Sequence, residues 1–267
     1  EFRRVLFRSH FIENCGPAKA RNFGVTKSFG DWIIFFDSDC TVPKNYFFEV
    51  EKFLDENKID FFGGPDMAAD NFTLLQKSIS FSMTSYITTG GIRGGDHSVD
   101  KFLPRSFNMG IKRIYFDEVG GFSDMRYGED LDLSYRLISA KKKSALIINA
   151  KVFHKRRTNL IDFFFQIFNS GKARYILNQK HKNSKKIFHL FPTIFLLLIV
   201  FSIIPINVNG FKINQLLGLI IFLYFAIIFM SSTFLFKNPI VGFMSIITTT
   251  VQFAGYSIGY VLSFVKS

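Results

Sequence analysis

Residues 32–39 read Trp-Ile-Ile-Phe-Phe-Asp-Ser-Asp, and this stretch decides the fold class. Its five apolar residues form a short aromatic run that is typical of a buried parallel strand. A helical pattern precedes the run over 16–29, another follows over 46–54, and 59–62 reads as a second short strand. Alternating strands and helices predict an α/β domain with a largely parallel sheet.

Two carboxylates follow the apolar run directly. In an extended chain, residues two apart point the same way, so Asp37 and Asp39 are expected to aim at one point. Open α/β sheets bind ligands at the carboxyl ends of their strands. Such a pair there suits Mg²⁺ or Mn²⁺, which would bridge a diphosphate and neutralise a leaving group. The alternative is a polar turn with a helix N-cap.

A second acidic cluster lies in Gly128-Glu129-Asp130-Leu131-Asp132-Leu133, shortly after Gly120-Gly121-Phe122. Acidic residues in a first helical turn interact favourably with the helix dipole, which is one explanation of the cluster. The other explanation is chemical, because a carboxylate at a helix start in a cleft can accept a proton from an attacking hydroxyl.

Five short motifs, in register from about residue 16 to 171, together resemble the middle of a family 2 glycosyltransferase domain. They are Ala20-Arg21-Asn22-x-Gly24, Gly30-Asp31 with the strand and Asp37-Ser38-Asp39, Gly63-Gly64-Pro65, Asn108-Met109 before Gly120-Gly121-Phe122, and the Gly128–Leu133 block. The resemblance implies a GT-A fold, which is a Rossmann-like α/β domain. It also implies transfer of a sugar from a nucleotide-sugar donor, with inversion at the anomeric carbon.

The resemblance assigns roles to the acidic residues. Asp37 and Asp39 match the metal and diphosphate motif, with Asp39 as the direct ligand of Mg²⁺ or Mn²⁺. Asp130 matches the catalytic base that deprotonates the acceptor hydroxyl, and Glu129 is its neighbour at the acceptor site.

The resemblance also marks residues around the donor. Arg21 and Asn22 belong to a helix that flanks the donor, and Asn108 is expected to line the sugar pocket. His154 is expected beside the diphosphate, although an isolated histidine is also a common satisfied polar residue. The segment 166–170 lacks the Gln-x-x-Arg-Trp motif of processive synthases, which argues against a processive role.

The beginning of the chain departs from the family pattern. Residues 1–9, Glu-Phe-Arg-Arg-Val-Leu-Phe-Arg-Ser, look like the translation of a sequencing adapter, so the native sequence is expected to begin near His10. The opening strand of the family, which carries an Asp for the nucleotide base, is then missing. Residues 10–158 are therefore expected to form an N-terminally truncated GT-A domain with exposed sheet edges, poor folding and poor donor binding.

The second half of the chain points to a membrane. Among the 267 residues, 48% are hydrophobic and 20% charged, which excludes a wholly disordered chain. The apolar runs 188–206, 216–236 and 240–265 each reach the ~20 residues that span a bilayer. Residues 187–267 therefore predict an all-α region of three transmembrane helices, with buried core helices as the alternative. Small residues at Gly255 and Gly259 favour close helix packing.

A basic segment precedes the apolar runs. The net charge is +12, and residues 151–186 hold ten Lys or Arg beside Asp162. Anionic lipid headgroups attract such a segment, and the positive-inside rule places its side in the cytoplasm. Apolar residues at helical spacing after residue 159 indicate an interfacial helix within 159–186, or else a core-packing helix.

These observations predict a multi-pass membrane glycosyltransferase of cell-envelope polysaccharide synthesis, with its catalytic domain on the cytoplasmic side. Its partners would be a nucleotide-sugar donor, a lipid-linked or surface-glycan acceptor, and membrane lipids. The alternative is a non-catalytic nucleotide-sugar-binding scaffold or transport subunit. Nucleic acid is not an expected partner, because no recognition motif is present and the apolar runs explain the adjacent charge.

Overall fold

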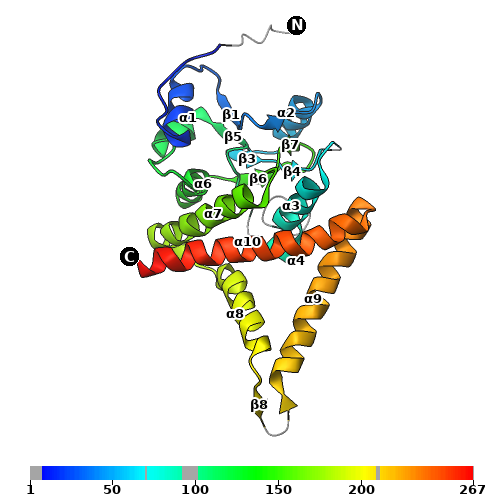
Figure 1. The fold of residues 1–267 in the computed structure, drawn as a ribbon. Helices are drawn as coiled ribbons and strands as arrows, with labels where there is room; N and C mark the ends of the chain where they lie inside the picture. Colours follow the sequence, from blue (N-terminus) through cyan, green and yellow to red (C-terminus); the bar gives the residue numbers. More distant parts are fainter. Residues whose placement is uncertain (1–7, 70, 92–101, 209–210, 267) are drawn as a thin grey trace.

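The computed structural model describes residues 8–69, 71–91, 102–208 and 211–266. An α/β domain forms the upper part of the molecule, and the C-terminal helices lie beneath it (Figure 1). The core of the domain is a four-stranded sheet in the order β1-β5-β3-β6. Its strands are β1 (Trp32–Phe36), β5 (Asn108–Lys112), β3 (Phe61–Gly63) and β6 (Ser144–Leu146).

The sheet is mixed, whereas the sequence pattern predicted a largely parallel one. β5 runs antiparallel to both of its neighbours, β1 and β3, and only the β3–β6 pair is parallel. The sequence pattern did not predict β5, because Asn108 and Gly110 interrupt its apolar character. A Cβ at Gly110 would lie 2.2 Å from the ring of Phe62, so this glycine makes room for the aromatic side chain of the adjacent strand. Among the described strands, β1 is an edge strand.

Alternate residues of the central strands pack on opposite faces of this sheet. On one face, Ile33 and Phe35 pack with residues of α1 (Pro17–Thr26), α5 (Arg113–Glu118) and α6 (Glu129–Ser139). On the other face, Ile34 and Phe36 pack against the cluster that contains Tyr46 and Val50 of α2 (Tyr46–Glu56). The sheet is thus covered by helices on both sides, as a Rossmann-like domain requires.

A smaller sheet lies at the end of β1. It has the order β2-β7-β4, formed by Cys40–Thr41, Val152–His154 and Asp66–Met67. The β2–β7 pairing sets Cys40 opposite His154, so residues more than a hundred positions apart meet directly after the Asp-Ser-Asp turn.

Local sequence signals set the starts of three helices that carry residues of the candidate site. α3 (Leu74–Thr84), which the short α4 (Tyr86–Thr89) follows, begins with a capping box between Thr73 and Gln76. α6 begins after Gly128, whose φ of +78° favours glycine. α7 (Leu160–Lys180) is capped by the side chain of Asn159.

The apolar C-terminal region differs from three straight spans. The first run forms a 3₁₀ turn (Ile187–Leu190) and α8 (Phe191–Ile203), whose 13 residues are too few to cross a bilayer. A short hairpin, β8 (Asn207–Val208) with β9 (Phe211–Lys212), connects α8 to α9. α9 (Ile213–Phe236) and α10 (Pro239–Val265) are the helices of the described residues that are long and apolar enough to span a membrane.

α10 lies across the base of the α/β domain, while α8 and α9 project away from it (Figure 1). The glycine spacing on α10 allows close packing against α7: a Cβ at Gly259 would lie 2.1 Å from the Phe168 carbonyl oxygen. In α7, Phe163 and Ile167 are buried with residues of α3. This part of the expected interfacial helix therefore contacts protein rather than lipid, as the core-packing alternative expects.

Candidate functional site

Arg21 joins three separate elements of the site. One guanidinium nitrogen donates to Glu129 Oε1 at the start of α6, and the other donates to Asp37 Oδ1 after β1, each at 2.7 Å. Burial opposes the charge of Arg21, but the two carboxylates raise its pKa above the ordinary value. The ring of Phe122 lies 5.6 Å from the guanidinium carbon, which adds a cation–π contact. The arginine thus holds the strand end and the α6 start together.

Glu129 does not titrate like an ordinary glutamate. Burial and the neighbouring Asp130 raise its pKa to about 7, and the contact with Arg21 only partly offsets this rise. Asp130 itself is oriented by backbone amides, since Leu131 N donates to Oδ1 at 2.7 Å and Ser106 N lies 3.4 Å from Oδ2. Two adjacent carboxylic groups therefore have different environments, which is an arrangement suited to acid–base chemistry.

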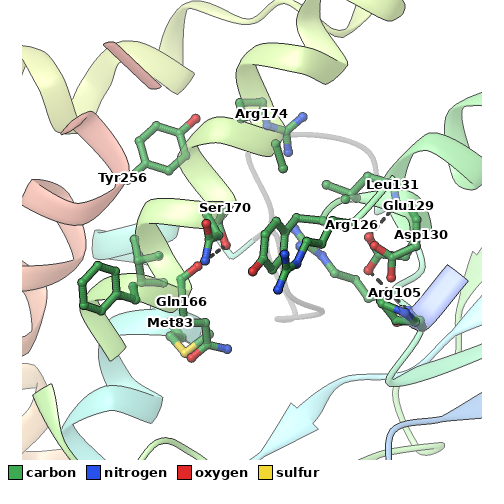
Figure 2. A pocket seen from close by; sticks show the side chains of 18 of the residues that line it. Met83, Arg105, Arg126, Glu129, Asp130, Leu131, Gln166, Ser170, Arg174 and Tyr256 are labelled. Carbon is green, nitrogen blue, oxygen red and sulfur yellow. Dashed lines mark hydrogen bonds between the residues drawn. The ribbon is translucent and has the colours of Figure 1, made fainter. Parts of the chain in front are cut away.

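Asp37, Glu129 and Asp130 line one cavity of about 780 Å³. Figure 2 shows Arg105, Glu129 and Asp130 on one side of this cavity, Gln166 on the other, and Arg174 between them at the upper edge. The cavity is also lined by five arginines: Arg21, Arg105, Arg126, Arg157 and Arg174. Such a concentration of guanidinium groups suits a ligand with several phosphate oxygens.

The two carboxylates of Asp-Ser-Asp do not converge, contrary to the expectation from extended spacing. Cys40 N donates to the Asp37 carbonyl oxygen, so a turn replaces the extended chain after Phe36. Asp37 faces Arg21 and the cavity, whereas Asp39 Oδ1 lies 3.3 Å from His154 Nε2. Asp39 and His154 are not among the residues that line the cavity.

A divalent cation fits beside Asp39. Ligand atoms of Asp39, Cys40 and His154 lie within 4.8 Å of one another. The hydrogen bond with His154 is the main cause that lowers the pKa of Asp39, so its carboxylate is ionised. Burial, followed by Asp37 and Asp39, raises the pKa of the Cys40 thiol to about 12, which disfavours it as a thiolate ligand. Asp39 and His154 therefore offer one oxygen and one nitrogen ligand.

Asn22 and Asn108, which the sequence predicted to lie near the donor, bond to other parts of the protein and do not line the cavity. The side chain of Asn22 makes two hydrogen bonds with the backbone of Phe122, through its nitrogen at 2.8 Å and its oxygen at 2.9 Å. Asn108 is fully buried, accepts from the Tyr46 hydroxyl at 2.6 Å and donates to the Ala150 carbonyl at 2.7 Å. The expectation that Asn108 lines the sugar pocket is therefore corrected: its amide joins β5 to α2 and to the segment before β7.

Of the five cavity arginines, only Arg21 was predicted from the sequence as a site residue. Arg157 and Arg174 belong to the basic segment that was assigned to lipid headgroups, yet both line the cavity. Arg174 is 8% exposed and donates to the Tyr135 hydroxyl at 3.1 Å. The signal available in the sequence was the position of Arg174 at the helical spacing of buried residues, opposite to the exposed face of α7.

Asp132 fixes the orientation of α6 although it lies outside the cavity. It is fully buried and contacts Ser123, Arg136, Lys180 and His181. Burial would raise its pKa, but hydrogen bonds from Lys180 and the other three groups lower it well below the ordinary value. The C-terminal end of α7 is thereby attached to the helix that presents Glu129 and Asp130.

Comparison with known proteins agrees with the resemblance of the sequence to family 2 glycosyltransferases. Residues 6–120 match the family model described as Glycosyl transferase family 2. The chain is 30% identical over 150 residues to the minor teichoic acid biosynthesis protein GgaB of Bacillus subtilis (strain 168), which covers 54% of this chain and 16% of that protein. It is 24% identical over 185 residues to the succinoglycan biosynthesis protein ExoA of Rhizobium meliloti (strain 1021), which covers 67% of this chain and 54% of ExoA.

A solved structure shares the fold. The mannosyltransferase PcManGT from Pyrobaculum calidifontis, in complex with GDP-Man and Mn²⁺, superimposes with a TM-score of 0.51 at 11% identity. The similarity covers 88% of this chain and 66% of that chain, so it extends beyond the α/β domain into the C-terminal helices. The family match ends before α6, and the positions of Glu129, Asp130 and His154 are therefore known from the structure.

Proposed function

We propose that the protein transfers a sugar from a nucleotide-sugar donor to an acceptor held at a membrane, because residues 6–120 match the family 2 glycosyltransferase model and the chain shares the fold of a solved mannosyltransferase. The observation that carries the proposal is the shared cavity, which is lined by Asp37, Asp130 and five arginines. The two curated proteins compared above are named for teichoic acid and succinoglycan biosynthesis, which supports a role in envelope polysaccharide assembly.

The transfer follows from the positions of these groups. Cavity arginines other than Arg174 bind the donor diphosphate, whose charge grows as its bond to the anomeric carbon breaks. The acceptor hydroxyl oxygen forms the new bond on the opposite face of the sugar, and its proton passes to Asp130. Attack from the opposite face inverts the anomeric configuration. The leaving nucleoside diphosphate takes the electron pair of the broken bond.

A metal ion belongs to this proposal because the residues beside the turn fit one. Asp39 and His154 would hold Mg²⁺ or Mn²⁺, and the structurally similar PcManGT was solved with Mn²⁺. When bound, the ion would add positive charge beside the turn whose Asp37 lines the cavity, and would so stabilise a departing diphosphate at that end of the cavity. Asp37 is already paired with Arg21, so its contribution is to fix that arginine at the cavity wall.

The C-terminal helices supply the membrane attachment, in an arrangement that revises the three-span expectation. We infer that α8 and α9 enter the bilayer as a hairpin, because their apolar side chains are largely exposed and they project from the domain (Figure 1). We infer that α10 lies along the membrane surface. One of its faces packs on the domain through Gly255 and Gly259, while Phe243 and Ile247 on another face are exposed.

The charge distribution gives the orientation of this hairpin. Lys185, Lys186, Lys237 and Lys266 flank the helix ends on the domain side, whereas Lys212 is the basic residue at the tip. The positive-inside rule then places the catalytic domain in the cytoplasm. Because α10 lies along the membrane surface and does not cross the bilayer, the C-terminus lies on the cytoplasmic side too. Three spans would place the C-terminus on the opposite side, and labelling of a C-terminal cysteine in sealed vesicles distinguishes the two.

The activity is tested with the full chain in membranes. A panel of radiolabelled nucleotide sugars is supplied with and without EDTA, and sugar in lipid extracts and free sugar are both measured. Replacing Asp130 with Asn should lower kcat by roughly 10²–10⁴-fold and leave donor binding largely unchanged. The control is Asp124→Asn, since Asp124 is an exposed partner of Lys19. Normal turnover by D130N would refute the assignment of Asp130 as the catalytic base. If the wild type neither transfers nor hydrolyses any donor, the result supports the scaffold alternative.

A further inference from the structure

A second cavity, of about 290 Å³, lies beside the first one. It is bounded by α4, the residues at the start of α8, and α10. Its wall is mainly apolar and includes the side chains of Phe188, Phe191, Pro192 and Phe253. α8 and α10, which border this cavity, also carry exposed apolar residues elsewhere on their surfaces, so the cavity lies next to the proposed membrane.

The two cavities adjoin through polar side chains. Arg174, Gln252 and Tyr256 line both of them. In Figure 2, Tyr256 lies on the side of the first cavity opposite to Glu129 and Asp130, and Arg174 lies between the two sides at the upper edge. A ligand that extends through both cavities would therefore have an apolar part in the second and a polar part in the first.

Unpaired buried polar atoms, one at the junction and one in the second cavity, point to a charged or hydroxylated ligand. Gln252 is 7% exposed and His189 is 9% exposed, yet Gln252 Oε1 and His189 Nδ1 have no hydrogen-bond partner among the described residues. Arg174 is buried, and in the described part of the chain no carboxylate lies within ion-pair distance of it. A buried cation of this kind is strongly stabilised by a bound anion.

We propose that the second cavity binds the hydrocarbon chain of a lipid-linked acceptor, with a phosphate of its head group at Arg174. The head-group hydroxyls lie next to Gln252 Oε1, and the hydroxyl that is glycosylated extends to Asp130 in the first cavity. This inference rests on the proposed function and names the acceptor as a phosphate-bearing lipid. It also explains why α10 is attached to the catalytic domain, since α10 forms one wall of the lipid site.

The test uses hexadecyl phosphate with a diazirine at the end of its alkyl chain, added to the detergent-solubilised full chain and irradiated. Peptides containing Phe191 or Phe253 should carry the label. Unlabelled hexadecyl phosphate should displace the probe at concentrations about tenfold lower than hexadecanol, because the phosphate–Arg174 interaction contributes at least that factor. In Arg174→Gln, this preference for the phosphate should disappear.

A matched pair of substitutions tests the position of the chain. Ile87→Trp places a large ring in the second cavity and should lower labelling about tenfold, whereas Leu197→Trp on the exposed side of α8 should not change it. Equal far-ultraviolet circular dichroism spectra and equal thermal unfolding midpoints of both variants and the wild type show that they are folded. Labelling spread evenly over α8 and α9, or equal displacement by hexadecanol in the wild type, overturns the inference. Labelling at the cavity without sugar transfer from any donor supports the lipid site and refutes the proposed function instead.

Discussion

Replacing Arg21 with Gln should destabilise the domain, and by an amount that depends on pH. The change removes two ion pairs at 2.7 Å, to Asp37 and to Glu129. The side chains of Arg21 and Glu129 are only 18% and 8% exposed. Removing one partner of such a pair leaves a buried carboxylate uncompensated, which costs about 3 kcal/mol. For a chain of this size that corresponds to a fall in Tm of roughly 6–12 °C.

The pH dependence comes from Glu129. Its pKa in the folded protein is raised to about 7, so at pH 6 it is mostly protonated and its ion pair with Arg21 is largely absent. Because Arg21 opposes this rise, removing it raises the pKa of Glu129 further. The R21Q variant should therefore lose more stability at pH 8.5 than at pH 6, by about 1.4 kcal/mol for each additional unit.

The measurement is thermal unfolding of the purified full chain in detergent, followed by tryptophan fluorescence at both pH values. Lys19→Gln on the same helix is the control, since its ion pair with Asp124 is exposed and should contribute at most about 1 kcal/mol. Glu129→Gln combined with R21Q should remove the difference between the two pH values. A fall in Tm no larger than that of K19Q, or one of equal size at pH 6 and pH 8.5, would refute the reasoning.

Three further predictions concern other parts of the molecule. Gly259→Leu should separate α10 from α7 and lower Tm by several degrees. Gly218→Leu is the control and should leave Tm unchanged, because no atom lies near its Cβ position. Equal effects of the two substitutions would contradict close packing of α10 on α7. Asn108→Ala should lower the free energy of unfolding by about 2–3 kcal/mol, because two buried partners lose their hydrogen bonds. Chemical denaturation measures this free energy, and a loss below about 0.5 kcal/mol would show that these two hydrogen bonds do not stabilise the fold. At pH 8, iodoacetamide should modify exposed Cys15 much faster than Cys40, whose pKa is about 12, and comparable rates by mass spectrometry would disprove the burial.

Much of the α/β domain was predictable because its signals are local. The apolar run at 32–36, the glycine before α6 and the caps of α3 and α7 each act within a few residues. The pairing direction of the sheet was not predictable in this way, because β5 has a weak strand pattern and lies between β1 and β3, strands that precede it by many residues.

The candidate site also combines features that local sequence predicts with features that depend on distant parts of the chain. The sequence predicted Asp37, Asp39 and Asp130 as site carboxylates, and the structure sets Asp37 and Asp130 around one cavity. The extended-chain argument for Asp37 and Asp39 was wrong because a backbone hydrogen bond closes the turn between them. Pairing of β2 with β7 then directs Asp39 to His154, a contact that depends on chain segments far apart in the sequence.

The sequence by itself determined the chemical groups available to this protein: the acidic motifs, the excess of arginine and lysine, and the long apolar runs. Composition and spacing are enough for that, because local conformation and hydrophobicity are properties of short segments. Only the tertiary structure decided that Arg174 faces a cavity instead of lipid, and that α10 packs along the domain. The reason is physical: which face of a helix becomes buried depends on the surface that another part of the chain presents to it.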